Sequence, residues 1–442
     1  MTRKLFISAL LAVATTANVH AGGLMTNTNY HIAFDRMFAR GATTEIDAAY
    51  SNPAGLAWGH EGFQFSLNFQ KPWQYRNIEA VTTAGNQKFE GKASAPIVPA
   101  LFASYKKDNW AFSTMIGIVG SGGFVEYKDG VPMFNMLVQG MLGQMNIAPG
   151  SYNIDSEMKG KQYIYGGQFN ITRKINDNFS ASIGVRANYY DGYYRGHVLA
   201  NGHSLLGDLT TLELDVTQRG WGFAPIVSFD YHKGPLTIGA RYEFRTKIET
   251  KNKTNTLNAG LGTALQTTLM QSNPAALQQI ATTLDTYTAE YKDGVKTRYD
   301  MPSLFVAAVG YEFTPQLRAS VEYHFFDDKH AKMAGDRQKE LNHGTHEVLA
   351  GVEYDINDKF TVSCGGQRTD YGLTDNYQKD TSFACDSYSV GCGGAWNINN
   401  KVRLNVSYFC TLYSDYNKPA SYGSEIYSRT NHVIGVGLDY KF

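Results

Sequence analysis

The end of the chain shows the pattern that most narrows the possible folds. Over the last ten residues, one set of alternate positions is apolar, while the other is mostly small or charged. The apolar set is Ile434, Val436, Leu438, Tyr440 and Phe442, and the other set is Val433, Gly435, Gly437, Asp439 and Lys441. A period of two residues is typical of a β-strand with two different faces. We therefore expect a terminal strand that finishes on an aromatic side chain.

The same alternation recurs along the chain, with charged side chains gathered on one face. One copy sets Leu317, Ala319, Val321, Tyr323 and Phe325 against Arg318, Ser320, Glu322 and His324. An apolar face opposite a charged face is typical of a wall between lipid and a wet lumen. After the first 21 residues, no apolar run approaches the roughly 20 residues that a spanning helix requires. The pattern predicts an all-β, transmembrane β-barrel.

Two kinds of connection alternate between the predicted strands, which is typical of short periplasmic turns and long external loops. The long loops are expected at about residues 72–94, 121–160, 193–213, 250–297, 328–343, 372–383 and 413–426. The strands are expected at about residues 61–71, 96–106, 109–120, 161–173, 178–193, 213–231, 235–249, 298–313, 316–327, 344–355, 359–371, 384–397, 400–412 and 427–442. These ranges predict a 14-stranded antiparallel barrel with both ends on the periplasmic side.

Composition agrees with a barrel and excludes some functions. The chain has 29 Tyr, 24 Phe and 44 Gly, and only 18% of its residues are charged. Its formal net charge is zero, so it lacks the basic field that recruits nucleic acid. Three of its four cysteines (Cys364, Cys392 and Cys410) fall on the apolar face of their strands, which favours small apolar side chains over disulfides.

The N-terminus divides into two segments before the first strand. Residues 1–21 combine Arg3 and Lys4, an apolar run and a Val19-His20-Ala21 end, which predicts a cleaved signal peptide and export. Residues 22–60 do not alternate, although they precede the barrel, residues 61–442, on its periplasmic side. Their apolar residues and a Ser51-Asn52-Pro53-Ala54-Gly55-Leu56 turn favour folding inside the lumen as a hatch.

The stretch from Arg40 to Gly55 resembles the end of the N-terminal hatch of the FadL-type outer-membrane transporters. In that family an Asn-Pro-Ala motif, here Asn52, Pro53 and Ala54 followed by Gly55, comes just before the first strand. The early hatch, residues 29–39, departs from the family because it is bulkier and more charged. The resemblance covers essentially the whole mature chain. The terminal Phe442 also resembles the C-terminal signal that the barrel-assembly machinery recognises in bacterial outer-membrane proteins.

The resemblance implies passive uptake of hydrophobic small molecules, such as long-chain fatty acids or aromatic hydrocarbons, across the bacterial outer membrane. External loops would capture the ligand, a lumen pocket beside the hatch would receive it, and a wall opening would release it into the bilayer. Glycines of the third strand and its exit, namely Gly117, Gly120, Gly122 and Gly123, permit a kink or bulge there. We expect a monomer with outer-membrane lipid around it, no cofactor and no enzymatic activity.

Two loops, at about residues 121–160 and 250–297, have apolar side chains at helical spacing and are expected to be partly helical. The first supplies the candidate binding residues Met133, Phe134, Met136, Leu137, Met141, Leu142 and Met145, and Met-rich surfaces suit apolar ligands of varied shape. The second has Leu257, Leu261, Leu265, Leu269, Leu277, Ile280 and Leu284, with a break near Pro274. Either the loops form an apolar ligand groove, or they only pack on each other over the barrel mouth.

Arginines that point inward by alternation are the other candidates. Arg186, Arg241 and Arg318 can each provide a charge-assisted partner for a carboxylated ligand. Alternatively, they pair with inward glutamates such as Glu243 and Glu353 and hold the hatch, which is the interpretation that we favour. His343 and His346 lack a third ligand nearby, so we expect no metal site.

Three other functions fit a barrel. An open porin for polar solutes is opposed by the hatch and by the apolar loops. An outer-membrane lipase or protease is a second alternative, although the sequence has neither a Gly-x-Ser-x-Gly elbow nor a His-Glu-x-x-His helix. A purely adhesive or antigenic surface barrel, the third alternative, would bind no small apolar ligand.

Overall fold

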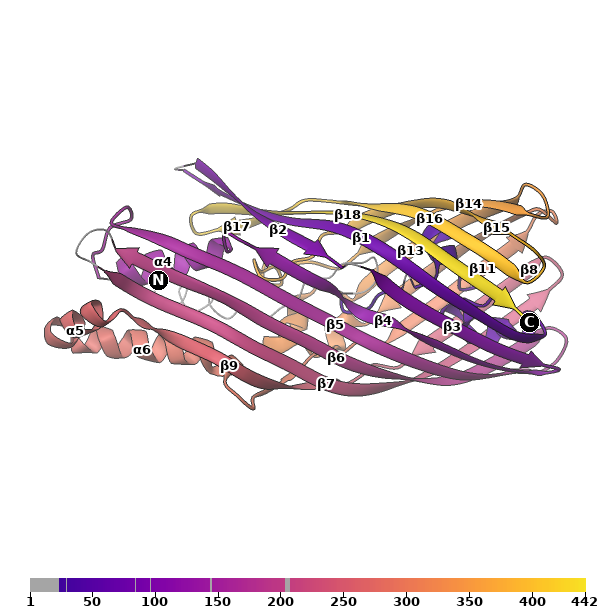
Figure 1. Cartoon of the computed structure of the whole chain (residues 1–442), viewed down its shortest axis with the longest axis horizontal. Helices are drawn as coiled ribbons and strands as arrows, with labels where there is room; N and C mark the ends of the chain where they lie inside the picture. The colour runs from indigo at the N-terminus through magenta and orange to yellow at the C-terminus, as the bar shows by residue number, and fades with distance from the viewer. Residues whose placement is uncertain (1–23, 29, 84, 96, 144, 203–206) are drawn as a thin grey trace.

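The computed structural model describes residues 24–442 except 29, 84, 96, 144 and 203–206. In this part of the chain, one antiparallel sheet of 18 strand segments closes on itself (Figure 1). Four pairs of segments, β2 with β3, β8 with β9, β10 with β11 and β16 with β17, each follow one another along a single barrel strand. The barrel therefore has 14 strands, as predicted. The predicted signal peptide, residues 1–21, lies outside the described residues.

The strand bounds follow in chain order. They are β1 (Gly62–Thr82), β2 (Gly85–Ser94), β3 (Val98–Lys107), β4 (Trp110–Tyr127), β5 (Tyr152–Lys174), β6 (Phe179–Gly202), β7 (Asp208–Lys233), β8 (Leu236–Glu243), β9 (Glu249–Leu261), β10 (Lys296–Arg298), β11 (Leu304–Glu312), β12 (Leu317–Phe326), β13 (Thr345–Asp355), β14 (Phe360–Asp370), β15 (Ser387–Asn397), β16 (Val402–Tyr413), β17 (Tyr416–Ala420) and β18 (Gly423–Lys441).

The first and last strands close the barrel. β1 pairs with β18 in continuous antiparallel register from Gln64 opposite Lys441 to Thr82 opposite Gly423. Along β18 the apolar set that includes Ile434 and Leu438 is exposed on the outside, because lipid rather than protein covers it. Along β1 the inward side chains Gln64, Ser66, Asn68 and Gln70 are buried. The lumen at this level is therefore polar, and the outer wall is apolar.

Several strands are longer than predicted. The segments expected as loops at residues 72–94 and 193–213 are mainly strand: β1 runs on to Thr82 and β2 returns from Gly85, while β6 runs on to Gly202 and β7 starts at Asp208. Beyond the lipid, the outer face needs no apolar side chains, so the alternation ends. The hydrogen-bonded ladder continues without it.

Helices occupy the loop end of the barrel. α4 (Pro132–Gly143) lies between β4 and β5, and α5 (Thr263–Ser272), α6 (Pro274–Thr288) and the short η2 (Ala289–Tyr291) lie between β9 and β10. Both helical loops agree with prediction, and the break falls at Pro274, whose ring suits the first turn of a helix. Leu257 and Leu261 were expected in the helical pair but belong to β9. Among the described residues, no helix is long and apolar enough to cross a membrane.

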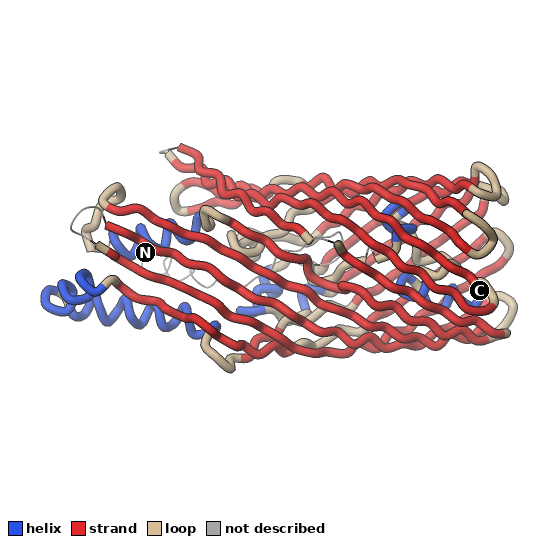
Figure 2. Tube along the Cα trace, viewed as in Figure 1, coloured by secondary structure: helices blue, strands red, loops and turns tan. Residues whose placement is uncertain are grey.

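The segment before β1 lies inside the barrel, where Figure 2 shows its helices surrounded by strands. α2 (Ile32–Met37) packs against β13, β14, β15, β16, β18 and β1, and η1 (Pro53–Trp58) packs against β4, β5, β6 and β7 on the opposite wall. α3 (Ala48–Ser51) lies between them in sequence and contacts β3 and β4. Contacts with walls on both sides mean that this segment fills the cross-section of the lumen.

The Asn-Pro-Ala motif fixes the end of this segment to the wall. Asn52 Nδ2 donates to Asp230 at 3.0 Å, and Ala54 N donates to Ser228 Oγ at 3.0 Å. The carbonyls of Pro53 and Ala54 accept from Thr172 at 2.8 Å and from Ser180 at 2.7 Å. Gly55 follows because a Cβ there would collide with the carbonyl oxygen of Thr43. The motif thus provides backbone groups to inward polar side chains of three strands, β5, β6 and β7.

Candidate ligand pathway

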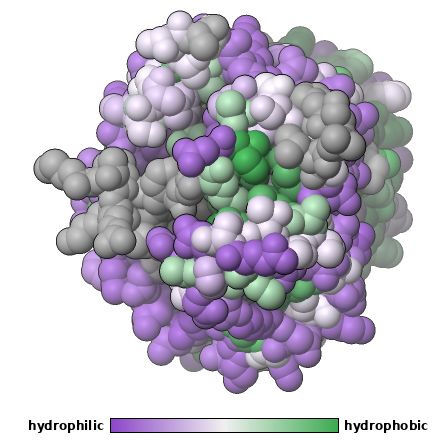
Figure 3. All heavy atoms as spheres, turned by 90° about the vertical axis from the view of Figure 1, so that its left-hand side faces the viewer, coloured by the Kyte–Doolittle hydropathy of each residue, from purple (hydrophilic) through white to green (hydrophobic). Residues whose placement is uncertain are grey.

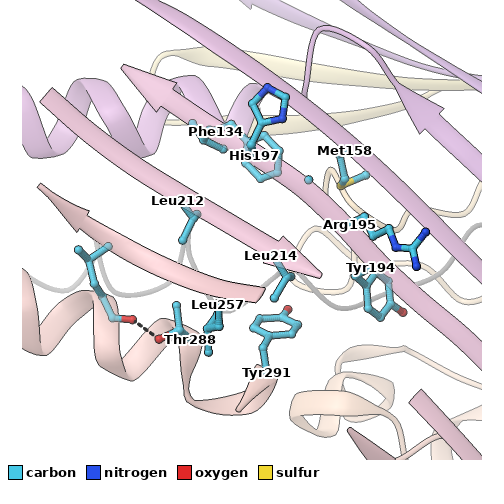
Figure 4. A pocket seen from close by; sticks show the side chains of 13 residues that line it. Phe134, Met158, Tyr194, Arg195, His197, Leu212, Leu214, Leu257, Thr288 and Tyr291 are labelled. Atoms are coloured by element: carbon cyan, nitrogen blue, oxygen red, sulfur yellow. Dashed lines mark hydrogen bonds between the residues drawn. The ribbon is translucent and has the colours of Figure 1, made fainter. Parts of the chain in front are cut away.

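An apolar pocket lies near the loop end of the barrel, between the wall and the helices (Figure 4). About 650 Å³ of space free of protein atoms lies between its lining residues, part of it open to solvent. Residues of β5, β6, β7 and β9 form one side, and α4, α6 and η2 form the other. Its lining is Phe134, Met158, Tyr194, Arg195, Gly196, His197, Val198, Leu212, Leu214, Leu257, Leu284, Thr288 and Tyr291. A concave, mainly apolar site with few polar groups is the usual form of a small-molecule site.

Arg195 and His197, the two basic residues of the lining, do not extend into its leucine-rich part. Figure 4 shows His197 and the guanidinium of Arg195 directed away from Leu212, Leu214 and Tyr291. Arg195 Nε forms an ion pair with Asp215 at 3.1 Å, on an exposed part of the wall. The interior of the pocket is therefore formed by aliphatic and aromatic groups.

Figure 3 looks onto the loop end of the barrel and shows hydrophobic side chains at the centre of a mostly hydrophilic rim. α4 contributes to the apolar interior beneath this rim. Its Phe134 lines the pocket, while Leu137 and Met141 pack against Leu269, Ile280 and Leu284 of the α5–α6 pair. Met133 and Leu142 are buried in a second apolar cluster, which includes residues of β1, β2 and β5, and Met145 packs against this cluster. Met136 is half-buried. Of these seven candidates, the structure brings Phe134 to the pocket.

The strand residues of the pocket were missed by the sequence analysis, because residues 193–213 were expected to be a loop. A signal was present. Along β6 the inward side chains change from Ser182, Arg186 and Asn188 to Tyr190, Tyr194 and Val198 as the strand approaches the loop end. The pairing of β9 with β7 also contains a register shift: Asp215 and Val216 of β7 are consecutive, but their partners in β9 are Thr256 and Thr254. Just beyond this shift, Leu257 lines the pocket.

The inward arginines are committed to other protein groups. Arg186 and Arg241 both pair with Glu243, and both guanidinium groups lie over the Tyr50 ring, at 5.5 Å and 4.5 Å from its centroid. Arg241 also donates to the carbonyl of Tyr50. Arg318 lies near the turn end, where it pairs with Glu353 and with Asp355. Arg186 and Arg241 thus contact Tyr50 of the hatch, whereas Arg318 pairs with carboxylates of the wall, and none of the three lines the pocket.

The wall has a gap in its hydrogen-bonded ladder beside the third barrel strand, although β3 and β4 stay in contact there. The β3–β4 ladder stops at Leu101 opposite Ile116, and the β2–β4 ladder starts only at Ser94 opposite Phe124. Against β5, the register of β4 shifts twice, between Ile118 and Gly120 and between Gly120 and Gly123. β4 thus advances five residues where β5 advances three. The predicted irregularity at these glycines is present, and Ile97 and Ile116, both more than half exposed, flank the gap on the outside.

The N-terminal segment covers this gap from the lumen. Asn27 N donates to the carbonyl of Val119 at 3.0 Å, and Tyr30 Oη donates to the same carbonyl at 2.9 Å. An added Cβ at Gly120 would collide with the carbonyl oxygen of Met25, so only glycine permits this close approach. Backbone groups that the irregular strand leaves without partners are satisfied by the segment before α2.

A loop carboxylate holds the start of the same segment. Asp328, in η3 (Asp328–His330), accepts hydrogen bonds from the backbone N–H groups of Leu24 and Thr345, the latter at 3.2 Å. Burial raises the pKa of Asp328 to about 7. The hydrogen bond from Leu24 to Asp328 joins the loop between β12 and β13 to the residues that cover the gap. The acceptor of this bond, the Asp328 carboxyl, therefore has a pKa near neutral pH.

A closed barrel with a polar, plugged lumen, an apolar pocket and a gapped wall defines an outer-membrane-type β-barrel. Residues 261–442 match the family model described as "Outer membrane protein beta-barrel domain". No curated protein sequence matches the chain.

Several solved structures match over nearly the whole length of the chain. A Pseudomonas aeruginosa FadL homologue is 14% identical with a TM-score of 0.66, and the match covers 95% of this chain and 100% of that one. The Pseudomonas putida toluene transporter TodX is 12% identical with a TM-score of 0.59, covering 96% and 99%. The Ralstonia pickettii toluene transporter TbuX is 13% identical with a TM-score of 0.52, covering 90% and 94%. The predicted resemblance to FadL-type proteins is thus confirmed for the fold.

Proposed function

We propose that the chain carries small hydrophobic molecules passively across the outer membrane. The main support is the arrangement of three features. An apolar pocket lies at the loop end, a gap interrupts the ladder of the wall, and the N-terminal segment plugs the lumen on the side of the turn end. Because an apolar molecule gains little from a water-filled pore, transfer through protein to lipid suits it better. The solved structures with this fold include two described as toluene transporters, which supports the same class of cargo.

The proposed path has three steps. The ligand enters between the α5–α6 pair and α4, where apolar side chains gather, and occupies the pocket beside Phe134. It then passes Tyr194 and reaches the cluster formed by Leu24, Met25 and Val119. Displacement of residues 24–28 from β4 opens the gap, and the ligand leaves sideways into the bilayer. Movement down a concentration gradient needs no bound energy source.

The first experiment asks whether an apolar molecule accompanies the protein. Native mass spectrometry of the protein purified from its host membrane is expected to show a bound hydrophobic ligand. Phe134→Ala removes a buried ring from the lining, so the affinity for that ligand should fall about tenfold or more. Met270→Ala, on the exposed face of α5, is the matched control and should leave binding unchanged. Repeated absence of any ligand from the wild-type protein would contradict the proposal.

The sideways exit has its own test. Deleting Ser121 and Gly122 shortens β4 by two residues, the number by which it exceeds β5 between Ile118 and Gly123, so the two strands regain a common register. We expect this variant to bind the ligand as the wild type does, while cells that produce it lose ligand uptake. Unchanged uptake with a straightened β4 would show that the ligand leaves by another route.

A further inference from the structure

The wall contains facing glycines where α2 packs against β14 and β15. Gly365 of β14 lies directly opposite Gly391 of β15. An added Cβ at Gly365 would collide with the carbonyl oxygen of Met37, and one at Gly391 would collide with that of Asp35. Glycine therefore lets the backbone of α2 approach the wall closely. It also weakens a strand, because it has no side chain to pack and loses more conformational freedom on folding.

The adjacent pair of residues on the same two strands consists of cysteines. Cys364 of β14 lies directly opposite Cys392 of β15, and the pairing of these strands has no shift in register. Both side chains are exposed on the outer face of the wall, while the neighbouring glycines face α2. The two thiols are free in this structure. They thus face each other on the outer side of the point where α2 meets the wall.

The hydrogen-bond pattern decides how close two facing side chains lie. At the turn end of this ladder, the backbone N–H of Asn397 donates to the carbonyl of Lys359 at 2.8 Å, so these two residues form a hydrogen-bonded pair. Hydrogen-bonded and non-hydrogen-bonded pairs alternate, and Cys364 and Cys392 each lie five residues from that pair. They therefore form a non-hydrogen-bonded pair, whose side chains lie closer together.

This kind of pair suits a disulfide. The Cα atoms of a non-hydrogen-bonded pair are typically about 4.5 Å apart, and disulfides span Cα distances of about 4.4–6.8 Å. Two cysteines at these positions can be joined without a change in the register of the strands. Each cysteine is also followed by two glycines in the sequence, which adapt easily to small changes in backbone geometry.

The other two cysteines do not compete for this bond. Cys385 lies in the loop between β14 and β15, where burial raises the pKa of its thiol to about 12, so it is rarely the reactive thiolate. Cys410 is on β16, opposite Val390 and His432. Of the four cysteines, all of which the structure describes, only Cys364 and Cys392 lie directly opposite each other.

We propose that Cys364 and Cys392 form a disulfide that cross-links β14 to β15 behind α2. Sequence alternation alone favoured small apolar side chains at these positions, because it could not show which cysteines face each other. The strand register supplies that information. The cross-link would compensate for the facing glycines that the contact with α2 requires, and it would hold the wall in place whether or not a ligand is bound.

The bond forms by thiol–disulfide exchange with a periplasmic thiol oxidoreductase in its disulfide form, since that compartment is oxidising. The thiolate of one cysteine attacks the disulfide of the oxidoreductase and releases one of its two sulfurs. The second thiolate then attacks this mixed disulfide, so that the bond between Cys364 and Cys392 forms and the other sulfur leaves. The oxidoreductase gains two electrons, and its two sulfurs take up the two protons that the cysteines lose.

Differential labelling of the protein purified from its host membrane tests the bond. Denaturation in excess N-ethylmaleimide blocks free thiols, and reduction followed by iodoacetamide then labels the cysteines released from disulfides. Peptide mass spectrometry should find iodoacetamide on Cys364 and Cys392 in most molecules, and N-ethylmaleimide on Cys385 and Cys410. N-ethylmaleimide on both Cys364 and Cys392, or a bond from either to another cysteine, would overturn the inference.

Variants identify the partner. Cys364→Ser should leave Cys392 free, so that N-ethylmaleimide labels it, whereas the matched control Cys410→Ser should leave the labels on Cys364 and Cys392 unchanged. A Cys392 that stays protected in the Cys364 variant would overturn the pairing.

A test with reduced protein in detergent micelles does not depend on oxidation in the host. Oxidised glutathione should join Cys364 to Cys392 and leave neither carrying glutathione. Stable glutathione adducts on both would mean that the two sulfurs cannot meet, and would overturn the inference.

Amide hydrogen exchange tests the effect of the bond on the wall. Reduction of the wild-type protein should speed exchange in β14 and β15 about tenfold or more, because the open chain is no longer constrained. The same treatment of the Cys364→Ser variant should change nothing. Equal exchange in the oxidised and the reduced wild type would overturn the stabilising role.

Discussion

At the scale of single residues, the lumen is organised around carboxylates that neutralise buried guanidinium groups. Glu243 pairs with both Arg186 and Arg241, and all three side chains are nearly inaccessible to solvent. Removing one partner of a buried pair leaves an uncompensated charge, which costs far more than the pair itself contributes. The Arg–Glu–Arg group also holds Tyr50, so its integrity affects the hatch as well as the wall.

Glu243→Gln is expected to destabilise the folded protein by about 3–5 kcal/mol, because two buried guanidinium groups then lack a counter-charge. Equilibrium unfolding in urea, with the protein in detergent micelles, measures this change. Glu249→Gln is the control: Glu249 pairs with Lys296 at 2.6 Å on the exposed surface, where solvent screens the ion pair, so its loss should change the stability little. Equal effects of the two substitutions would mean that the Arg–Glu–Arg group is not a buried charge network.

Asp328 predicts a pH dependence. Its pKa is about 7 in the folded protein, because burial disfavours the charged form, whereas an unfolded Asp titrates near 3.9 (roughly). Between these values the folded state holds a proton that the unfolded state has lost, so its contribution to stability is complete below about pH 4 and is lost as the pH rises through 7. Hydrogen-exchange protection of residues 24–28 should fall accordingly. Asp328→Asn stays neutral and should remove this dependence, and an identical pH profile in the variant would contradict the assignment.

At the scale of elements, the period of two residues predicted the parts of the strands that face lipid, and it missed the parts that extend beyond the membrane. The 14 strands were predicted because each places apolar residues outward at the membrane. The continuation of β1 beyond Trp73, with Tyr75 outward and Arg76 buried inward, was assigned to a loop since both faces carry polar groups there. The pocket shares this cause. Phe134 was found through helical spacing, whereas Leu212 and Leu214 lie on a strand extension that no lipid-facing pattern marks.

The structure of η1 depends on one close backbone approach, at Gly55. Gly55→Ala places a methyl group against the carbonyl oxygen of Thr43, so η1 and the loop before α3 must move apart, at a cost of about 1–3 kcal/mol. Faster amide hydrogen exchange over residues 48–58, with an unchanged barrel, is the expected result. Gly167→Ala on β5, where an added Cβ has no neighbour within 4 Å, is the control. Unaltered exchange in the Gly55 variant would mean that η1 has room to accommodate the methyl group.

At the scale of the whole molecule, the lumen has a plugged half at the turn end and a half with an apolar pocket at the loop end. The turn half is lined by polar side chains such as Gln64, Ser66 and Asn188, and the N-terminal segment fills it, while the loop half holds the apolar pocket beside buried charged side chains such as Arg76 and Arg337. A polar lumen without the segment would hold water and pass ions, as porins do. The chain therefore combines a wall suited to an aqueous channel with a plug that prevents one, and apolar cargo is the kind that such a barrel can still transfer.

Single-channel recording in planar bilayers tests this division. The full-length protein should show little or no steady ion conductance, and a variant lacking residues 22–58 should conduct steadily through the emptied polar lumen. A variant lacking the external helices, residues 263–288, is the matched control: it loses a segment of comparable kind outside the lumen, keeps the plug and should stay closed. Steady conductance of the full-length protein would favour the porin alternative, because water and ions would then have a path past the N-terminal segment. A folded but closed plug-deletion variant would show instead that the wall itself, and not residues 22–58, closes the barrel.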